Sequence, residues 1–240
     1  MPTQGSISAA PLASFDAICR RAAAVGLAVR GAFHPEPDEF DQKIPGLRAA
    51  TIILLGFIGS LQWEHFQRSL ESGDGSAHPL DRWSRRVIST LAREFGAVAV
   101  YPQGEERPLP FQRLALRSEP VHQSPIGLLI HPLWGLWHAY RGAIVLANRI
   151  EVPDIAPSMH PCENCAARPC LGTCPVGAFR AGSFDLQACT SHLRSAAGSA
   201  CRDGGCLARR SCPVGTAFRY NVEQMRFHMH AFIGSMTTEV

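Results

Sequence analysis

Lysine is nearly missing from this chain of 240 residues, which has only Lys43, and the formal net charge is only +3. The arginines are scattered along the sequence and form no basic stripe that could follow a phosphate backbone. We therefore expect that the protein has no nucleic-acid partner.

Long apolar runs and a secretory leader are missing as well. The most apolar segment, residues 49–61, carries no charge but is well short of the roughly 20 residues that a membrane-spanning helix needs. The N-terminal sequence MPTQGSISAAPLASF has no basic region followed by an apolar core, as a secretory signal would. We expect a cytoplasmic protein that is not inserted in a membrane and whose thiols are reduced.

Cysteine, in contrast, is concentrated in one region. Eight of the nine cysteines lie within residues 162–212, in two runs that each close with Cys-Pro. Eight thiolates are what two [4Fe-4S] clusters need, and in two-cluster ferredoxins the fourth cysteine of one run ligates the other cluster. This rule divides the cysteines into two predicted ligand sets: Cys162, Cys165, Cys170 and Cys212 for one cluster, and Cys174, Cys189, Cys201 and Cys206 for the other.

Disulfides and structural zinc are the alternatives for these cysteines. A disulfide framework needs an oxidising compartment. Zinc favours paired Cys-x2-Cys units, whereas Cys189 is isolated and both runs end in Cys-Pro. Both alternatives stay open but fit the pattern less well than the clusters do. The ninth cysteine, Cys19, lies on an apolar helix face and is expected to be a small buried hydrophobe.

The pattern of apolar residues predicts two domains, 1–152 and 153–240, because the proline-rich bridge that contains Val152 separates an apolar region from the cysteine-rich one. The first domain is expected to be α+β, with a central sheet and helices packed against it. Helices are predicted at 11–25, 80–95 and 216–233, and strands at 27–33, 51–57, 97–101, 127–131 and 143–147.

The segment 126–157 combines two strands with a turn that holds a histidine, His131, and two tryptophans, Trp134 and Trp137. Indole faces and one directed imidazole bond suit the wall of a pocket for a flat, conjugated ligand. An equally good reading is a packed aromatic corner in which His131 is satisfied by the backbone.

The same segment resembles the CblC family of cobalamin-processing proteins, which have a nitroreductase-like fold and remove the upper axial ligand of base-off cobalamin. The matching positions are Ile130, His131, Pro132, Gly135, Trp137, Arg141, Gly142 and Ile150 to Asp154. The resemblance implies a nitroreductase-like mixed sheet with flanking helices and a cobalamin pocket at His131, Gly135, Trp137 and Arg141. In that pocket His131 and Trp137 would line the corrin, Arg141 would face a peripheral carboxamide or phosphate, and the chain would supply no cobalt ligand.

The cysteine-rich region resembles a different family, the C-terminal part of epoxyqueuosine reductases and, more distantly, of reductive dehalogenases. These enzymes join a nitroreductase-like cobalamin domain to a small ferredoxin-like domain with two clusters, and the order of their cysteines is similar to the order here. Epoxyqueuosine reductases use an aspartate as proton donor, whereas the corresponding segment, residues 98–107, has none. Without a placed acid, we do not expect their tRNA chemistry here.

Together these features predict an oxidoreductase, an iron-sulfur reductase that binds cobalamin and passes electrons from two [4Fe-4S] clusters to the corrinoid, removing its upper axial ligand. Its partners would be the corrinoid and an upstream electron-donor protein. The main alternative is a ferredoxin-type electron carrier whose first domain docks on another protein. A flavin-dependent reductase is a third possibility, but the sequence has no glycine-rich phosphate loop for the flavin.

Overall fold

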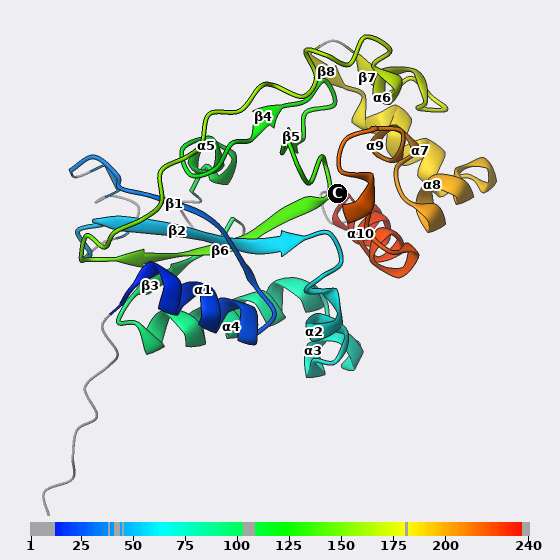
Figure 1. The fold of residues 1–240 in the computed structure, drawn as a ribbon. Coiled ribbons are helices and arrows are strands. Elements are labelled where there is room, and N and C mark those ends of the chain that lie inside the picture. The colour runs from blue at the N-terminus through cyan, green and yellow to red at the C-terminus, as the bar shows by residue number, and fades with distance from the viewer. Residues whose placement is uncertain are drawn as a thin grey trace, which may run out of the picture.

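The computed structural model describes residues 13–37, 39–40, 44, 46–102, 109–180 and 182–236 (Figure 1). Its elements, in chain order, are α1 (Phe15–Ala24), β1 (Ala28–Phe33), β2 (Thr51–Ile58), α2 (Trp63–Gln67), α3 (Leu70–Gly73), α4 (Pro79–Glu94), β3 (Val98–Val100), α5 (Phe111–Leu116), β4 (His122–Gln123), β5 (Leu129–Ile130), β6 (His138–Leu146), α6 (Pro169–Gly172), β7 (Phe179–Arg180), β8 (Ser183–Phe184), α7 (Leu186–Arg194), the 3-10 helix η1 (Ala196–Gly198), α8 (Ser199–Gly204), α9 (Leu207–Arg210), the 3-10 helix η2 (Thr216–Phe218) and α10 (Val222–Ser235).

A four-stranded sheet with the order β1-β2-β6-β3 forms the centre of the fold. The predicted strands at 27–33, 51–57, 97–101 and 143–147 correspond to its four strands, so the α+β class with a central sheet is confirmed. The sheet was expected to be mixed, but every pairing in the described part of it is antiparallel. Apolar periodicity does not encode strand direction, which explains this difference.

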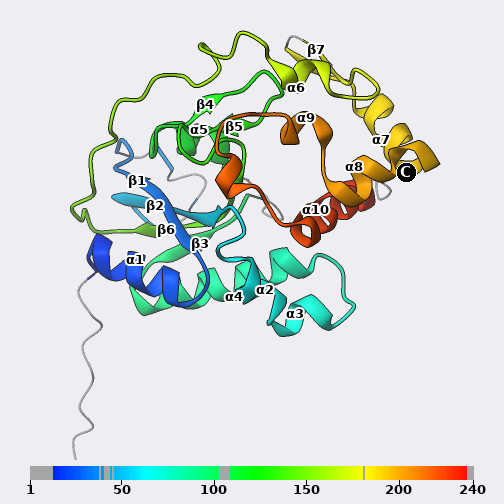
Figure 2. The same ribbon diagram turned by 45° about the vertical axis from the view of Figure 1, so that its right-hand side comes forward.

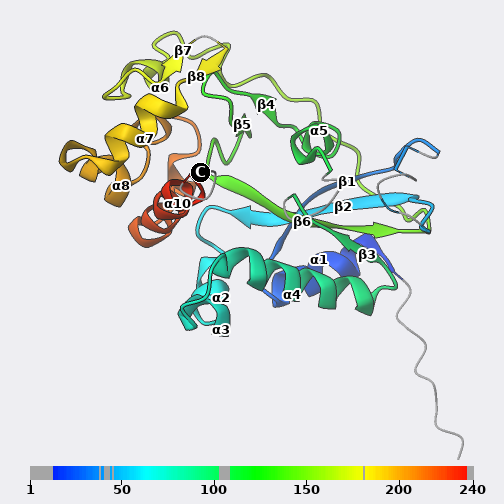
Figure 3. The same ribbon diagram turned by 180° about the vertical axis from the view of Figure 1, so that it is seen from behind.

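Both faces of the sheet are covered, and β2 is therefore buried along nearly its whole length. On one face Ile53, Leu55 and Phe57 pack with α1 and α4. On the other face Ile52 and Leu54 pack with α5. Figures 1 and 3 show the two helices below the sheet and α5 above it.

Two β-bulges interrupt this sheet, and each leaves an arginine without a partner in the strand ladder. The register of β1 shifts between Val29 and Gly31, so that Arg30 is the extra residue. The register of β2 and β6 shifts in the same way, and Arg141 is extra on β6. Bulges re-aim side chains, and these two arginines reach groups that a regular strand would not bring them to.

Glycines end the first and fourth helices as the sequence predicts. Gly26 follows α1 with φ +83°, and Gly96 follows α4 with φ +62°, a conformation that favours glycine. The predicted helix at 216–233 begins only at Val222, where Asn221 caps it by accepting a hydrogen bond from the Gln224 amide. The predicted strand at 127–131 contributes only β5, which pairs with β4 in a separate two-stranded sheet.

The cysteine-rich region consists of short helices, α6 to α9, and the β7-β8 hairpin, and α10 packs against α8. Figure 2 shows the long irregular connection from β6 to α6 passing on the α5 and β4 side of the molecule. The predicted boundary at Val152 falls in this connection. The two regions nevertheless pack together: the ring of Phe227 in α10 contacts the ring of Trp63, with 5.2 Å between the ring centroids.

None of the described helices combines the length and the apolar character needed to cross a membrane.

Candidate functional site

The first thiol set surrounds the start of α6 and the end of α9 and consists of Cys162, Cys165, Cys170 and Cys212. Cys170 and Cys212 are buried. The pKa of Cys162 is raised to about 11, first by burial and then by the neighbouring thiols of Cys212, Cys170 and Cys165. Apolar side chains pack around this set, among them Ile126, Ile130, Leu136 and Val214.

The second thiol set consists of Cys174, Cys189, Cys201 and Cys206, and all four line one small cavity. The pKa of Cys189 is raised to about 11, first by burial and then by the thiols of Cys206, Cys174 and Cys201. The cavity wall is otherwise largely apolar and includes Phe179, Leu193 and Met229.

The structure thus groups the eight cysteines as the Cys-Pro rule divides them. Cys174 follows Cys170 closely in sequence yet faces the other set, and Cys212 returns to the first. All nine cysteines are free thiols. Within the described ranges, no three or more His, Cys, Asp or Glu side chains are arranged to hold a single metal ion.

The donor chemistry of both sets fits an iron-sulfur cluster. Burial and neighbouring thiols raise the pKa of Cys162 in the first set and of Cys189 in the second, and a cationic iron centre would compensate the thiolate charge there. Their role as cluster ligands remains a prediction.

A cleft lies between the sheet and the cysteine-rich region. It is lined by residues from α5, β5, β6, α9 and α10 and from the turns beside them: Gln112, Leu128, Leu129, Leu136, His138, Ala139, Tyr140, Arg141, Arg209, Tyr220 and His228. Three buried polar atoms of these residues, His138 Nδ1, the Tyr220 hydroxyl and His228 Nε2, have no hydrogen-bond partner within the described part of the chain. Burying a polar group without a partner is costly, and these three atoms lie beneath the surface of the cleft.

Both cleft histidines are neutral. His138 Nε2 lies 3.0 Å from the Leu129 carbonyl oxygen, which only accepts, so Nε2 carries the proton and Nδ1 is an acceptor. The pKa of His138 is well below its usual value, chiefly because of burial and then because of Arg30 and Arg209. Burial, followed by Arg209 and Arg141, lowers the pKa of His228 to about 3.

Arg209 joins the cysteine-rich region to the sheet region at the cleft. Its Nε donates to the Leu136 carbonyl oxygen at 3.1 Å. Its guanidinium carbon lies 4.7 Å from the centre of the Trp137 ring and 4.6 Å from that of Tyr220. Leu136 lines the cleft and also belongs to the apolar group that packs with the first thiol set. The cleft and these thiols therefore share a wall.

Only one of the four residues predicted to bind cobalamin lines this cleft, namely Arg141, which also donates hydrogen bonds to Asp81 and Ser84. Trp137 is 1% exposed and packs edge-on against Tyr220, behind the cleft wall. His131 lies elsewhere, in a groove beside β1. It stacks on Trp134 with 3.7 Å between ring centres.

Gly135 holds the turn after β5 against the Cys-Pro turn that follows α9. Its φ is +59°, and a Cβ atom built on it would lie 2.0 Å from the Val214 carbonyl oxygen. Gly215, in the facing turn, makes an equally close approach to Trp134. Only glycine fits at either place, so Gly135 determines how the two regions meet.

Three residues that the sequence analysis missed form a buried polar group next to the cleft: Arg30, Glu119 and Tyr140. Arg30 Nη2 lies 2.9 Å from Glu119 Oε2, and the side chains of Arg30 and Glu119 are 0% and 4% exposed. The Tyr140 hydroxyl donates to Glu119 Oε1. These residues come from three distant segments, and no local spacing links them.

We predict that His131 stays neutral down to about pH 4. Burial, followed by Arg30 and His122, lowers its pKa to about 4, against about 6.5 in an unfolded chain. Between these values only the unfolded chain binds the proton, so the free energy of unfolding falls by about 3 kcal/mol as the pH drops from about 6.5 to about 4. Histidine NMR, with His131→Phe to assign the resonance, measures this pKa, and a value near 6.5 would contradict the prediction.

The fold and site together define an α+β protein with two sets of four thiols, one of which shares a wall with the cleft beside the sheet. Comparison with solved structures finds the same fold in epoxyqueuosine reductases. One, solved with an epoxyqueuosine-modified tRNA stem loop, has a TM-score of 0.50 and 14% identity over 86% of this chain and 66% of its own. The enzyme from Streptococcus thermophilus has a TM-score of 0.49 and 14% identity, over 85% and 67%. No family profile matches the chain, nor does any curated protein.

At this identity the likeness shows the fold alone, and the chain spans 66% of the length of the tRNA-bound structure. The likeness nevertheless corrects one expectation. We expected no nucleic-acid partner, and this was wrong, because a structure of the same fold holds a tRNA stem loop. Net charge is a sum over the whole surface, whereas folding can gather arginines that are apart in sequence. Here Arg82, Arg85 and Arg141 line one cavity.

Proposed function

We propose that this protein is an iron-sulfur reductase that carries two [4Fe-4S] clusters and binds a corrinoid in the cleft, from which it removes the upper axial ligand. The observation that carries the proposal is the cleft itself, which has three unpartnered buried polar atoms and shares a wall with one thiol set. The fold neighbours are reductases by name, which supports the same class of reaction.

The two thiol sets would each hold one cluster, and bound clusters supply single electrons at potentials that hydrogen bonds, charge and exposure can tune. The apolar residues around the sets keep water away from the thiolates. Because the cysteines must be reduced to bind iron, the proposal places the protein in the cytoplasm. An upstream protein would deliver the electrons.

The cleft would bind the corrinoid through its polar edge, since a corrinoid carries many amide groups that both donate and accept hydrogen bonds. His138 Nδ1 would accept from an amide N–H, and the Tyr220 hydroxyl would be satisfied in the same way. Arg209 and Arg141 give the cleft two fixed cations. A bound corrinoid supplies a cobalt centre that changes its oxidation state as the axial ligand leaves.

The likeness to the CblC family in the segment 126–157 supports a corrinoid in preference to a flavin, and it implies a nitroreductase-like first domain, 1–152, followed by a ferredoxin-like domain, 153–240. His131, Gly135 and Trp137 would then act indirectly, because they lie behind the cleft wall or in the groove beside it. Arg141 would contact the corrinoid.

A second candidate is a ferredoxin-type electron carrier whose first domain docks on another protein. Exposed apolar side chains near the second thiol set favour it: Val176, Phe184 and Leu186 are 38%, 42% and 41% exposed. Exposed apolar surface is typical of a docking site. A carrier would load iron fully and leave cobalamin in solution unaltered.

Anaerobic titration of the iron-loaded protein with cyanocobalamin tests the proposal. The visible spectrum of cobalamin should shift on binding, and His228→Phe should weaken the affinity about 3- to 10-fold by removing one hydrogen bond. His230→Phe is the matched control, because His230 lies on the same helix but is exposed and pairs with Asp203. A fully iron-loaded protein that leaves the cobalamin spectrum unmoved would refute the corrinoid and favour the carrier.

A further inference from the structure

A small apolar face lies outside the second thiol set. Val176, Phe184 and Leu186 are exposed there, and Phe179 stacks on Phe184 with 4.9 Å between ring centres. The backbone amide of Asp185 donates to the Ala178 carbonyl oxygen at 2.8 Å, which holds the start of α7 beside β7. We call Val176, Phe179, Phe184 and Leu186 the hairpin face. Figures 1 and 3 show β7 and β8 at the outer edge of the cysteine-rich region, away from the central sheet.

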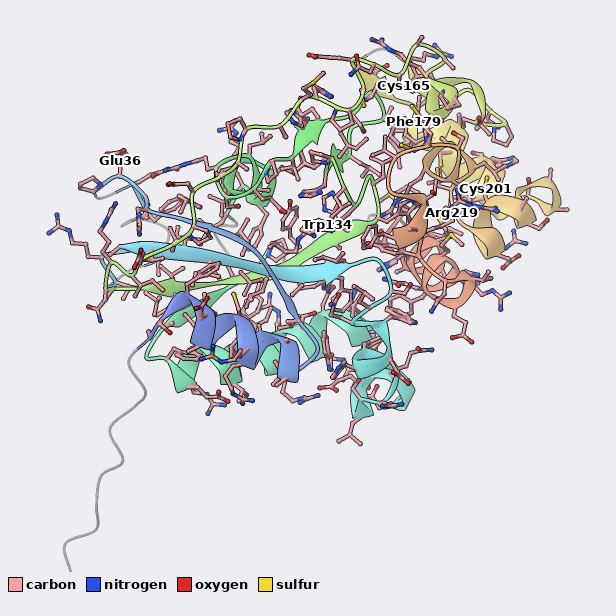
Figure 4. All side chains as sticks on the ribbon, in the orientation of Figure 1. Glu36, Trp134, Cys165, Phe179, Cys201 and Arg219 are labelled. Atoms are coloured by element: carbon pink, nitrogen blue, oxygen red, sulfur yellow. The ribbon has the colours of Figure 1, made fainter. Side chains whose placement is uncertain are left out.

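The hairpin face also forms part of the wall around the second thiol set. Val176 and Phe179 line the cavity of these four thiols, so the same side chains contact the cavity and the outer surface. Figure 4 labels Phe179 and Cys201, two residues of this cavity, at the end of the molecule opposite Glu36. An electron that enters through this face would have only one layer of side chains to cross.

The two thiol sets differ in their relation to the cleft. Leu136 joins the first set to the cleft, whereas none of the described residues that line the cavity of the second set lines the cleft. Electrons bound for the cleft would therefore enter at the second set and leave from the first.

Positive charge is concentrated in the same region. Residues 162–212 contain six arginines and three acidic residues, so their net charge of +3 equals that of the whole chain. Arg180 in β7 and Arg194 at the end of α7 are exposed, and no carboxylate among the described residues pairs with either. Asp185 is the only acidic residue between them, and its side chain caps α7. The face is therefore apolar with a positive border, which complements an acidic partner.

We propose that the hairpin face, with Arg180 and Arg194, docks an acidic electron-donor protein that passes electrons to the second thiol set. The inference deepens the proposed function and rests on its clusters, because it gives the upstream donor a docking place and a charge. In each encounter the donor, a low-potential one-electron carrier, loses one electron and a cluster on the second set gains it, and no bond forms or breaks. Contacts between electron-transfer partners are small, below about 1,200 Å², which suits a face of four side chains.

Stopped-flow reduction of the iron-loaded protein, without corrinoid, tests the face. The probe is a reduced plant-type ferredoxin, an acidic protein with a potential near about −400 mV. The double variant Arg180→Glu, Arg194→Glu should be reduced about 10-fold more slowly at an ionic strength of about 0.01 M, where the Debye length is about 30 Å. At about 1 M, where it is about 3 Å, the difference should vanish.

Leu186→Ser tests the apolar part of the face. It should raise the ferredoxin concentration that half-saturates the rate about 3- to 10-fold at both ionic strengths, because apolar contact does not depend on charge screening. Calorimetric binding of oxidised ferredoxin, in which no electron moves, should weaken by the same factor. Leu70→Ser is the matched control, because Leu70 is 88% exposed but lies on α3.

Two further controls separate docking from other effects. Arg20→Glu, Arg93→Glu makes the same change of charge on α1 and α4, at exposed arginines outside the cysteine-rich region, and should keep the ferredoxin rate within about 2-fold. Reduced methyl viologen, a small cation that needs no docking face, should reduce every variant no more slowly than the wild type.

Equal ferredoxin rates in the wild type and in Arg180→Glu, Arg194→Glu at low ionic strength would overturn the proposal. An equal loss in the two double variants would overturn it too, because net charge alone would then set the rate. A wild-type dimer that Leu186→Ser converts to a monomer would assign the face to a second copy of this chain instead. If ferredoxin docks as expected but cyanocobalamin is left unchanged, the proposed function fails and the docking face stands.

Discussion

Cys212→Ala is expected to remove one [4Fe-4S] cluster and leave the other in place, lowering the iron content from about eight to about four per chain. The cluster lost is the one on Cys162, Cys165 and Cys170, although Cys212 lies far from them in sequence and next to α9. The reason is that the structure places the Cys212 thiol among those three. Iron analysis, with electron paramagnetic resonance of the reduced protein, measures the outcome.

Cys174→Ala is the informative partner of this variant. It should remove the cluster of the second thiol set, because Cys174 faces Cys189 rather than the nearby Cys170. The two variants should therefore retain different clusters with different spectra. Cys19→Ala is the control and should keep about eight irons, because Cys19 lies on α1 and belongs to neither set. Identical remaining spectra in Cys174→Ala and Cys212→Ala would show that the grouping is wrong.

Gly135→Ala is expected to lower the melting temperature of the iron-loaded protein by about 6–12 °C, as a loss of about 3 kcal/mol would in a chain of this size. Two costs add. The left-handed backbone at φ +59° strains any residue with a Cβ, and this Cβ would lie 2.0 Å from the Val214 carbonyl oxygen. Because the turns on either side of the cleft must then separate, binding of cyanocobalamin should weaken in parallel.

Gly127→Ala is the control that separates the cost of backbone strain from the cost of the close contact. Gly127 also has a positive φ, +78°, but no atom lies within 4 Å of the position that a Cβ would take. Only the backbone strain of about 1–2 kcal/mol should remain, so the melting temperature should fall by about 2–8 °C with cyanocobalamin binding unchanged. Equal losses of stability and binding in the two variants would show that the contact at Val214 is not tight.

The sequence predicted best where chemistry or burial leaves a local signature. The Cys-Pro endings divide the cysteines into the two sets that the structure brings together, because the rule depends on ligand order and not on loop length. The strands of the central sheet could be predicted from the sequence because they consist largely of apolar residues, as in β2. Gly26 and Gly96 could also be predicted as helix ends, because the positive φ that ends a helix favours glycine and is a local property of the chain.

The sequence could not predict features that depend on distant contacts. The predicted helix at 216–233 is too long at its start, because Tyr220 packs against Trp137, which is distant in sequence, and α10 begins only at Val222. By resemblance, a proton-donating acid would lie within residues 98–107, of which 103–107 are outside the described residues. The buried acid that the structure does show, Glu119, is positioned by Arg30 and Tyr140, and the bulge that re-aims Arg30 leaves no mark in the sequence.

The placement of His131 shows the same limit. A histidine between tryptophans suits both a ligand wall and a packed corner. In the structure its Nδ1 accepts hydrogen bonds from the backbone amides of Leu133 and Trp134, at 3.0 and 3.3 Å. The corner therefore satisfies the imidazole locally, while the residue also lines the groove. The cleft beside it is marked by His138 and His228, which stand in no recognisable motif.

The most direct test of the account is a single-turnover, stopped-flow experiment in which the protein, with its clusters reduced beforehand, is mixed with cyanocobalamin in the absence of air. We predict that the visible absorption of the oxidised clusters returns at the same rate as cobalt is reduced, and that one HCN forms per cobalamin. Clusters that stay reduced beside bound, unchanged cyanocobalamin would contradict it.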